Sequence, residues 1–353
     1  MDGADAVLIQ MQGKQWQRAV AHSFLPYSDG LRQELLALQD IGENELHRSN
    51  ILAQTLSRLY AQTVQQLLTK QNLSAKDITA IGCHGQTIRH APEHGYSIQL
   101  VNLPLLAELT GIFTIGDFRS RDLACNGQGA PLVPAFHEAL FRDANETRAV
   151  LNIGGISNIS ILPPNSPSFG FDTGPGNMLM DAWMQHIWQQ PYDKNGEKAA
   201  QGEILPDLLA SLLDHPYFSR PYPKSTGREL FSLSWLQCRL KGNEKPEDVM
   251  RTLVFYTAQT IFDATKQAAP AIHHLYICGG GIRNPVLMHD LETLFSPDTK
   301  LYSTAKLHLD PQWVEAAAFA WLAACWCNQV PSNPHHATGA HSHRILGSGH
   351  YGN

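Results

Sequence analysis

The chain lacks the features that mark membrane, nucleic-acid-binding and disulfide-rich proteins. No stretch approaches about 18 consecutive apolar residues, and the acidic start of the chain is unlike a secretory signal. Lys and Arg total 26 against 32 Asp and Glu, so there is no basic excess to attract nucleic acid. The six cysteines are scattered, mostly within apolar runs, which predicts reduced thiols in a cytoplasmic protein. We therefore expect neither nucleic acid nor a membrane as a partner.

Length and composition favour two α/β domains with substantial cores. The chain has 353 residues, of which 43% are hydrophobic. The polar segment 142–148 predicts a boundary, after which a strand, Gly-rich turn and strand repeat the opening pattern, as a diverged duplication would. We predict an N-terminal lobe over residues 1–145, a C-terminal lobe with the nucleotide site over 146–330, and a tail over 331–353. We expect the histidine-rich tail to be solvated rather than to bind a metal. The alternative is that it packs on the first lobe.

One stretch combines a carboxylate with a phosphate-binding pattern. Residues 170–177 place Asp172 on a Gly/Pro-rich turn before a helix that begins at Met178. Upstream, residues 149–162 predict two short strands joined by Gly154 and Gly155. Glycines let a backbone approach phosphate, a helix start offers free N–H groups, and a nearby carboxylate can accept a proton from an attacking oxygen. The alternative is two ordinary turns with an aspartate that caps backbone groups.

Polar residues at the ends of two further predicted strands are candidates for substrate binding. The strand over residues 77–83 ends in His84, Gln86 and Thr87, and ligands of open α/β sheets bind at such ends. The strand over residues 112–115 leads to Arg119, whose planar fork suits an anionic or hydroxyl-rich substrate. The alternatives are a structural histidine, and an ion pair between Arg119 and Asp117 or Asp122.

A second glycine cluster and a capped helix follow in the second half. The strand over residues 275–278 runs into Gly279, Gly280 and Gly281, and a helix follows from Val286, so a nucleotide could lie against this backbone. A later helix is predicted to begin at Asp310 and Pro311, which places Glu315 near its N-terminal end. Long helices are predicted over residues 51–70 and 249–265.

The beginning of the chain predicts an incomplete hairpin. Residues 5–11 and 16–24 form two predicted strands, but the Gly-bearing turn at residues 1–5 has no strand ahead of it. We therefore expect the first strand of this lobe to be missing.

The ordered set of these motifs resembles the anhydro-N-acetylmuramic acid kinase family, within the acetate/sugar kinase–Hsc70–actin superfamily. The resemblance covers nearly the whole chain. It is carried by residues 1–5 (MDGAD), 84–87 (HGQT), 117–119 (DFR), 127–132 (GQGAPL), 152–158 (NIGGISN), 171–177 (FDTGPGN), 224–229 (KSTGRE) and 278–281 (CGGG).

The resemblance implies two RNase H-like lobes with an active-site cleft between them. It implies ATP and Mg²⁺, with no metal site made by the protein alone, and a bicyclic 1,6-anhydro amino sugar. Water would open the anhydro bridge at C1 while O6 takes the γ-phosphate, giving N-acetylmuramate 6-phosphate in peptidoglycan recycling. A homodimer is also compatible with it.

The resemblance also implies roles for individual residues. Asp172 would be the base, Glu315 would position the sugar or the water, and Arg119 would contact the sugar or the developing charge. The implied cofactor-binding residues are Asp2, Gly3 and Asp5 in a first phosphate loop, Gly154, Gly155 and Asn158 in a second, and Gly279, Gly280 and Gly281 beside the adenosine.

The family's first phosphate loop normally begins with a Ser-Gly-Thr-Ser type run before Met-Asp-Gly, whereas this sequence starts at that Met. Weaker phosphate binding is therefore expected. The alternatives are a non-catalytic nucleotide- or sugar-binding member of the superfamily, and a phosphatase on the same scaffold.

Overall fold

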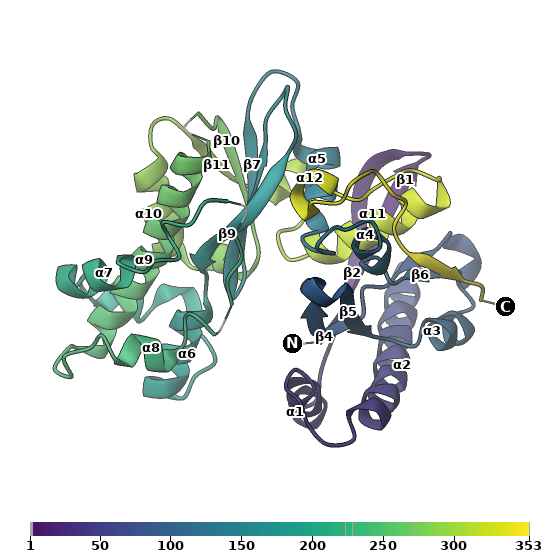
Figure 1. Ribbon diagram of the computed structural model, residues 1–353, viewed down its shortest axis with the longest axis horizontal. Helices are drawn as coiled ribbons and strands as arrows, with labels where there is room; N and C mark the ends of the chain where they lie inside the picture. The colour runs from purple at the N-terminus through teal and green to yellow at the C-terminus, as the bar shows by residue number, and fades with distance from the viewer. Residues whose placement is uncertain (1–2, 223, 228, 270, 353) are drawn as a thin grey trace. The chain divides into compact units, whose positions relative to one another are not determined.

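A computed structural model describes residues 3–222, 224–227, 229–269 and 271–352. The chain forms two compact units (Figure 1). Unit 1 comprises Met1–Phe136 and Trp313–Asn353, and unit 2 comprises His137–Gln312. Each unit combines helices and strands, so the expected α/β class is confirmed. Asp2 lies outside the described residues.

Unit 2 is built on one five-stranded sheet with the order β11-β10-β7-β8-β9. The strands β7, β10 and β11 are parallel, whereas β8 is antiparallel to both β7 and β9. In chain order this is the 3-2-1-4-5 arrangement of an RNase H-like domain. The strands are β7 (Arg148–Ile153), β8 (Ile156–Leu162), β9 (Phe169–Pro175), β10 (His274–Cys278) and β11 (Lys300–Ser303).

Apolar residues on one side of each helix bury the sheet of unit 2. The long helix α9 contacts β9, α6, α7 and α10, and fully buried side chains such as Leu253 and Ile261 join Leu151 and Ile277 of the strands in one core. The helices are α6 (Met178–Trp188), α7 (Pro206–Leu213), α8 (Leu233–Gln237), α9 (Pro246–Ala268) and α10 (Pro285–Phe295). Predicted helices 249–265 and 286–295 and strand 275–278 are confirmed.

Unit 1 contains two hairpins and a small sheet. The hairpin β1–β2 matches the strands predicted over residues 5–11 and 16–24, and β12 and β3 flank β6. Residues 77–80 of the predicted strand 77–83 are not in the ladder, because a 3₁₀ turn capped by Ser74 and Asp77 precedes it. The strands are β1 (Gly3–Gln12), β2 (Gln15–Pro26), β3 (Ile81–Gly82), β4 (Gln86–Ala91), β5 (Tyr96–Leu100), β6 (Thr114–Gly116) and β12 (Ser348–His350).

The helices of unit 1 include two from the last part of the chain. Helix α2 begins six residues before the predicted start at 51, and α11 begins at Val314 rather than at Asp310, whose carboxylate instead accepts from the Gln312 N–H in a turn. The helices are α1 (Asp29–Ala37), α2 (Glu45–Gln71), α3 (Leu103–Thr110), α4 (Ser120–Leu123), α11 (Val314–Cys327) and α12 (His335–Thr338). Helix α5 (Val133–Phe141) contains the point at which the two units divide.

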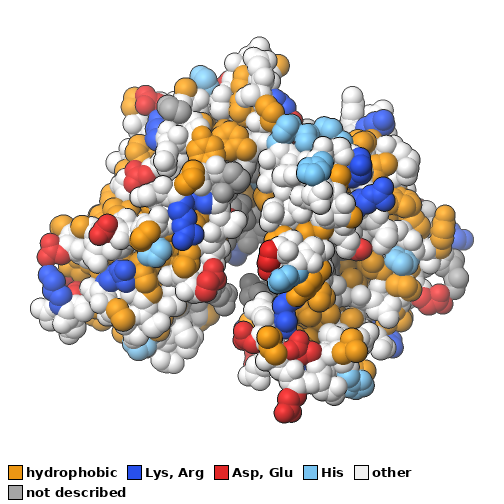
Figure 2. All heavy atoms as spheres, viewed as in Figure 1, with side chains coloured by type: hydrophobic (Ala, Val, Ile, Leu, Met, Phe, Trp, Pro, Cys, Tyr) orange, Lys and Arg blue, Asp and Glu red, His pale blue; other side chains and the backbone are white. Residues whose placement is uncertain are grey.

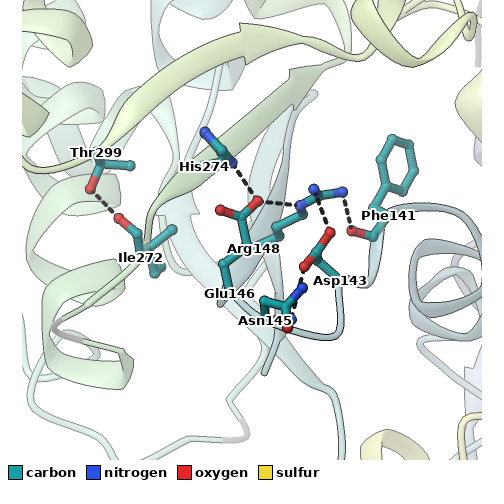
Figure 3. Close-up of polar contacts among 8 residues, drawn as sticks. All are labelled: Phe141, Asp143, Asn145, Glu146, Arg148, Ile272, His274 and Thr299. Atoms are coloured by element: carbon teal, nitrogen blue, oxygen red, sulfur yellow. Dashed lines mark hydrogen bonds and ion pairs between the residues drawn. The ribbon is translucent and has the colours of Figure 1, made fainter. Parts of the chain in front are cut away.

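The division into units differs from the boundaries drawn at residues 145 and 330. Helix α11 lies in unit 1 because it contacts β1 and β3. The polar segment 142–148 belongs to unit 2, where Arg148 pairs with Asp143 (2.7 Å) and Glu146 (2.8 Å), and Glu146 also contacts His274 of β10 (2.6 Å) (Figure 3). These contacts fix the segment to the N-terminal ends of β7 and β10.

The expectation of a solvated tail is wrong. Strand β12 pairs with β6, and Asn333 and Thr338 are 3% and 1% exposed. The cause is the carboxylate of Asp122, which is fully buried and accepts hydrogen bonds from both of these side chains. In the described part of the chain no group of three or more His, Cys, Asp or Glu could hold a metal ion.

The surface shown in Figure 2 carries acidic and basic side chains interspersed with hydrophobic ones over both units. Of the described helices, none is both long enough and apolar enough to cross a membrane.

Candidate active site

The structure places Asp172 inside strand β9, not on a turn as expected. Asp172 lies opposite Asn158 of β8, next to an irregularity in the ladder between Ser157 and Asn158. The predicted turn is in fact strand because residues 169–175 pair with β8 along their length. Asp172 is therefore held by a sheet rather than by a mobile turn.

The carboxylate of Asp172 is only partly compensated by hydrogen bonds. Its Oδ2 accepts from the Thr226 N–H at 3.0 Å, and its main chain accepts from the Tyr217 hydroxyl at 2.6 Å. Desolvation raises the pKa of Asp172 to about 6, and the bond from Thr226 opposes that rise. A carboxylate with this pKa is mostly ionised at neutral pH and accepts a proton more readily than an ordinary aspartate.

The glycine turn between β7 and β8 is fixed to the start of helix α6. The N–H groups of Gly176 and Met178 donate to the Gly155 carbonyl, at 2.9 and 3.1 Å, and the Asn177 N–H donates to that of Gly154 at 2.8 Å. A Cβ at Gly176 would lie 2.3 Å from the Gly154 oxygen, so only glycine allows this approach. The glycine turn and the helix start thus form one corner.

The chain's own packing explains some of the predicted nucleotide-binding glycines but not others. Gly279 has φ +83°, and a Cβ at Gly281 would lie 2.3 Å from the Ile153 side chain. A Cβ at Gly154, Gly155 or Gly280 would meet nothing closer than 3.5 Å. A Cβ would make only ordinary van der Waals contacts there, so packing within the chain does not require glycine at these last three positions.

In unit 1, His84 and Arg119 form one hydrogen-bonded pair. Nε and Nη2 of Arg119 lie 3.2 and 2.9 Å from Nε2 of His84, and Nη1 donates to the Gly129 carbonyl at 2.7 Å. Burial and the Arg119 charge lower the pKa of His84 to about 3, so the ring is neutral and its Nε2 accepts. His84 also lies against Phe319, with ring centroids 4.4 Å apart. We conclude that His84 orients Arg119.

The alternative of an ion pair at Arg119 is not seen. Within the described residues, no carboxylate lies within 4.0 Å of its guanidinium. Asp117 instead accepts from Ser120, and Asp122 accepts from the Gly129 N–H. Burial lowers the pKa of Arg119, and the fields of Glu315 and Asp122 oppose that shift. The guanidinium is thus partly buried, and no carboxylate among the described residues bonds to it directly.

The other residues predicted at this strand end are partly engaged within the β4–β5 hairpin. The Thr87 hydroxyl accepts from Gln99 at 3.2 Å, and Gln86 donates to the Thr87 carbonyl at 3.4 Å. Among the described residues, neither is hydrogen-bonded to Arg119, so the structure does not join His84, Gln86 and Thr87 into one cluster.

Glu315 lies in the first turn of α11, as expected, and its residue is exposed. Although solvent reaches this carboxylate, the protein atoms crowded around it displace part of its water and raise its pKa, the Arg119 charge opposes that rise, and Asp5 adds a smaller rise. Asp5 contacts His22 at 2.7 Å, and His22 stacks on Trp313 immediately before α11. Gly3 is required by the hairpin, since a Cβ there would lie 2.3 Å from the Leu25 oxygen.

Three buried residues that sequence reasoning did not single out support these groups. Asp122 ties the Gly129 loop to the end of the chain, and Tyr217 and Lys224 lie beside Asp172. The motif at residues 224–229 contained a signal, since it is one of those that carry the family resemblance, but it assigned no role to Lys224.

The glycine corner at a helix start and the desolvated carboxylate, both on an RNase H-like sheet, suit phosphoryl transfer. The family model described as anhydro-N-acetylmuramic acid kinase matches residues 1–352. The chain belongs to the anhydro-N-acetylmuramic acid kinase family, and it is an enzyme.

Individual relatives agree with that assignment. The anhydro-N-acetylmuramic acid kinase of Neisseria meningitidis serogroup C (strain 053442) is 70% identical over 351 residues, 99% of this chain and 96% of the relative. That of Nitrosomonas europaea is 50% identical over 351 residues, with the same coverage of both chains. These names give no support to the non-catalytic alternative.

A solved structure was also matched. The activator of the 2-hydroxyisocaproyl-CoA dehydratase from Clostridium difficile with bound ADPNP is 13% identical, covers 93% of this chain and 96% of its own, and has a TM-score of 0.47. At that score the likeness adds nothing to the family assignment.

Proposed function

We propose that this chain uses ATP to convert 1,6-anhydro-N-acetylmuramic acid to N-acetylmuramate 6-phosphate, in peptidoglycan recycling. Family membership supports the substrate. The observation that carries the chemistry is the position of Asp172, which is desolvated and holds a pKa of about 6 on a rigid strand next to the glycine corner.

In this reaction Asp172 is the general base. Water gives a proton to Asp172 and bonds to C1 of the sugar, the C1–O6 bond breaks, and its electron pair goes to O6. O6 then bonds to the γ-phosphorus, and the β–γ bridging oxygen leaves with ADP. The proton on Asp172 is released to solvent when the product leaves.

Arg119 and Glu315 are the proposed contacts to the sugar. The partly buried guanidinium bonds to no carboxylate among the described residues, so it favours an anionic group or an oxygen that becomes negative during the reaction. His84 acts through Arg119, because its accepting Nε2 holds two N–H groups of the fork. Glu315, with a raised pKa, is suited to accept a hydrogen bond from the sugar or the reacting water. Gln86 and Thr87 remain proposed sugar contacts.

The glycines that packing does not require support the proposal that ATP binds to this backbone. The corner at Gly154 and Gly155 and the backbone at Gly280 leave room for phosphate oxygens and the nucleoside, and Asn158 lies opposite Asp172 in the ladder. Gly279 and Gly281 shape that backbone, and Asp5 and Gly3 lie in the proposed first phosphate loop. Mg²⁺ neutralises phosphate charge and binds through the nucleotide with one or two carboxylates, so a cluster of three protein ligands is not needed.

The six cysteines are all free thiols, which supports a cytoplasmic location. A homodimer stays a prediction of the family resemblance.

The experiment is an ADP-release assay with and without the anhydro sugar, comparing the wild-type chain with Asp172→Asn. We expect sugar-dependent ADP release in the wild type and a loss of about 10²- to 10⁴-fold in the variant, because the base is gone. Asp263→Asn is the matched control: Asp263 lies on α9 and desolvation also raises its pKa. ADP release without sugar would instead indicate a phosphatase-type activity.

A further inference from the structure

Beside Asp172 lies a buried lysine for which the proposed reaction has no use. Lys224 is 8% exposed. A buried ammonium is costly and is usually paired with a carboxylate. In the described part of the chain no carboxylate lies within 4.0 Å of it, whereas Lys241 and Lys266 do have such partners. An ion pair therefore does not explain why a lysine is buried at this position.

The acceptors of Lys224 are two carbonyls on one side of a loop. Its Nζ donates to Phe218 at 3.0 Å and to Tyr217 at 3.3 Å, and it lies 4.9 Å from the centre of the Tyr217 ring. We name residues 217–222 and 224–226 the covering loop. The ammonium thus joins the second half of this loop to the first.

The two halves of the covering loop are held very differently. The first half is anchored in the core, since the Tyr217 side chain is fully buried and both Tyr217 and Phe218 pack against Phe231. The second half reaches β9 through two main-chain groups: the Lys224 carbonyl accepts from the Asp172 N–H, and the Thr226 N–H donates to Asp172 Oδ2, both at 3.0 Å. Among the described residues, the Nζ bonds of Lys224 are the side-chain contact that joins this half to the anchored first half, whose Tyr222 also stacks on Phe169 and Phe171 of β9.

We propose that Lys224 is a positioning residue that holds the second half of the covering loop against Asp172. This rests on the proposed role of Asp172 as the base. The loop then does two things: it fixes one carboxylate oxygen through Thr226, which leaves the other for the reacting water, and it excludes solvent from the carboxylate.

The pH dependence of the reaction reports on this role. Desolvation is the larger influence on the pKa of Asp172, and the Thr226 N–H is the smaller, opposing one. The titratable groups of the loop are Tyr217, Arg220, Tyr222 and Lys224, and β8 opposite supplies the neutral Asn158. Release of the loop would rehydrate Asp172, so its pKa should fall from about 6 toward 3.8.

The test is the pH profile of kcat/KM for sugar-dependent ADP release in Lys224→Met, whose side chain has similar length but no charge or donor. We expect the acid limb to move to lower pH and the turnover at pH 7.5 to fall by about ten- to 100-fold, because the base is less well placed. Lys198→Met is the matched control: Nζ of Lys198 also lies over an aromatic ring, that of Trp188 at 5.2 Å, and its profile should stay as in the wild type.

An acid limb that stays in place or moves to higher pH in Lys224→Met would overturn the proposal. If Lys224→Met does not fold, the pH profile of Lys224→Gln is the test instead. Glutamine keeps a neutral donor, so the acid limb should move to lower pH by a smaller amount. Asp172→Asn is measured in parallel. Full turnover in Asp172→Asn would remove the proposed function itself, whereas an inactive Asp172→Asn beside an unshifted Lys224→Met would remove only the role of Lys224.

Discussion

At the scale of single residues, the chemistry depends on a carboxylate that folding makes less acidic. Asp172 loses water on entering β9 and regains one hydrogen bond to its side chain, so its pKa rises to about 6. The strand fixes the orientation of the Asp172 backbone, and the raised pKa means that its carboxylate accepts a proton more readily than an ordinary aspartate. The same burial that makes the base effective also makes its charge costly.

The cost of burying this charge makes the free energy of unfolding depend on pH. The folded state binds the Asp172 proton more tightly than the unfolded state, so stability falls as pH rises from about 3.8 to about 6. Asp172→Asn removes the charge, and we expect it to raise the free energy of unfolding at pH 8 by about 1–3 kcal/mol. Urea unfolding at pH 8 and pH 4 checks this: the gain should shrink at pH 4, and an equal gain at both values would contradict it.

The glycines of the corner separate into structural and binding positions. We expect Gly155→Ala to fold normally, because its Cβ would meet the Met178 Cβ at an ordinary 3.9 Å, and to raise the KM for ATP about tenfold, because that Cβ would hinder the proposed approach of a phosphate to the backbone. We expect Gly176→Ala to lower the free energy of unfolding by about 1–3 kcal/mol, because its Cβ would lie 2.3 Å from the Gly154 oxygen. Thermal unfolding and ATP titration of both variants check this. An unaltered KM in Gly155→Ala would argue against a phosphate at the corner.

At the scale of elements, local patterns identified most helices and strands but misplaced two that matter. Gly and Pro at 170–176 are typical of a turn, yet pairing with β8 along the edge of the sheet makes them strand. Asp310 and Pro311 are typical of a helix start, yet Asp310 caps a turn and the Pro311 carbonyl accepts from Gly279. The strand depends on pairing with β8, and the conformation at Pro311 depends on a bond from Gly279; local propensity includes neither partner.

The final segment of the chain is held by one buried carboxylate. Thr338→Val removes a donor to Asp122 Oδ1, 2.9 Å away, and we expect it to lower the free energy of unfolding by about 1–3 kcal/mol. The matched control is Thr63→Val, a buried threonine whose hydroxyl donates only to its own helix, at Leu59. Its effect should be smaller. Chemical unfolding, together with hydrogen exchange at residues 332–344, would measure the difference between the two variants. An equal loss of unfolding free energy in both would contradict the role of Asp122.

At the scale of the whole molecule, the sequence could predict the class and family better than the division of the chain. An ordered set of motifs over nearly the full length is specific even when each motif is weak, and the match over residues 1–352 agrees. The catalytic candidate could be found because its neighbours are glycines. Its supports, Lys224 and Tyr217, could not, because their role depends on tertiary contacts.

The units could not be drawn from composition alone. Helix α11 belongs to unit 1 because it packs on β1 and β3, and the polar segment 142–148 is tied into unit 2 by ion pairs. A polar stretch indicates exposure but does not say on which side a domain ends.

The most direct measurement of the central claim is mass spectrometry of the sugar product formed from 1,6-anhydro-N-acetylmuramic acid and ATP. We expect the wild-type chain to yield a sugar heavier by one water and one phosphoryl group, and Asp172→Asn to yield about 10²- to 10⁴-fold less of it. A phosphorylated product that has gained no water, or an Asp172→Asn variant that forms the full product at the wild-type rate, would contradict the account.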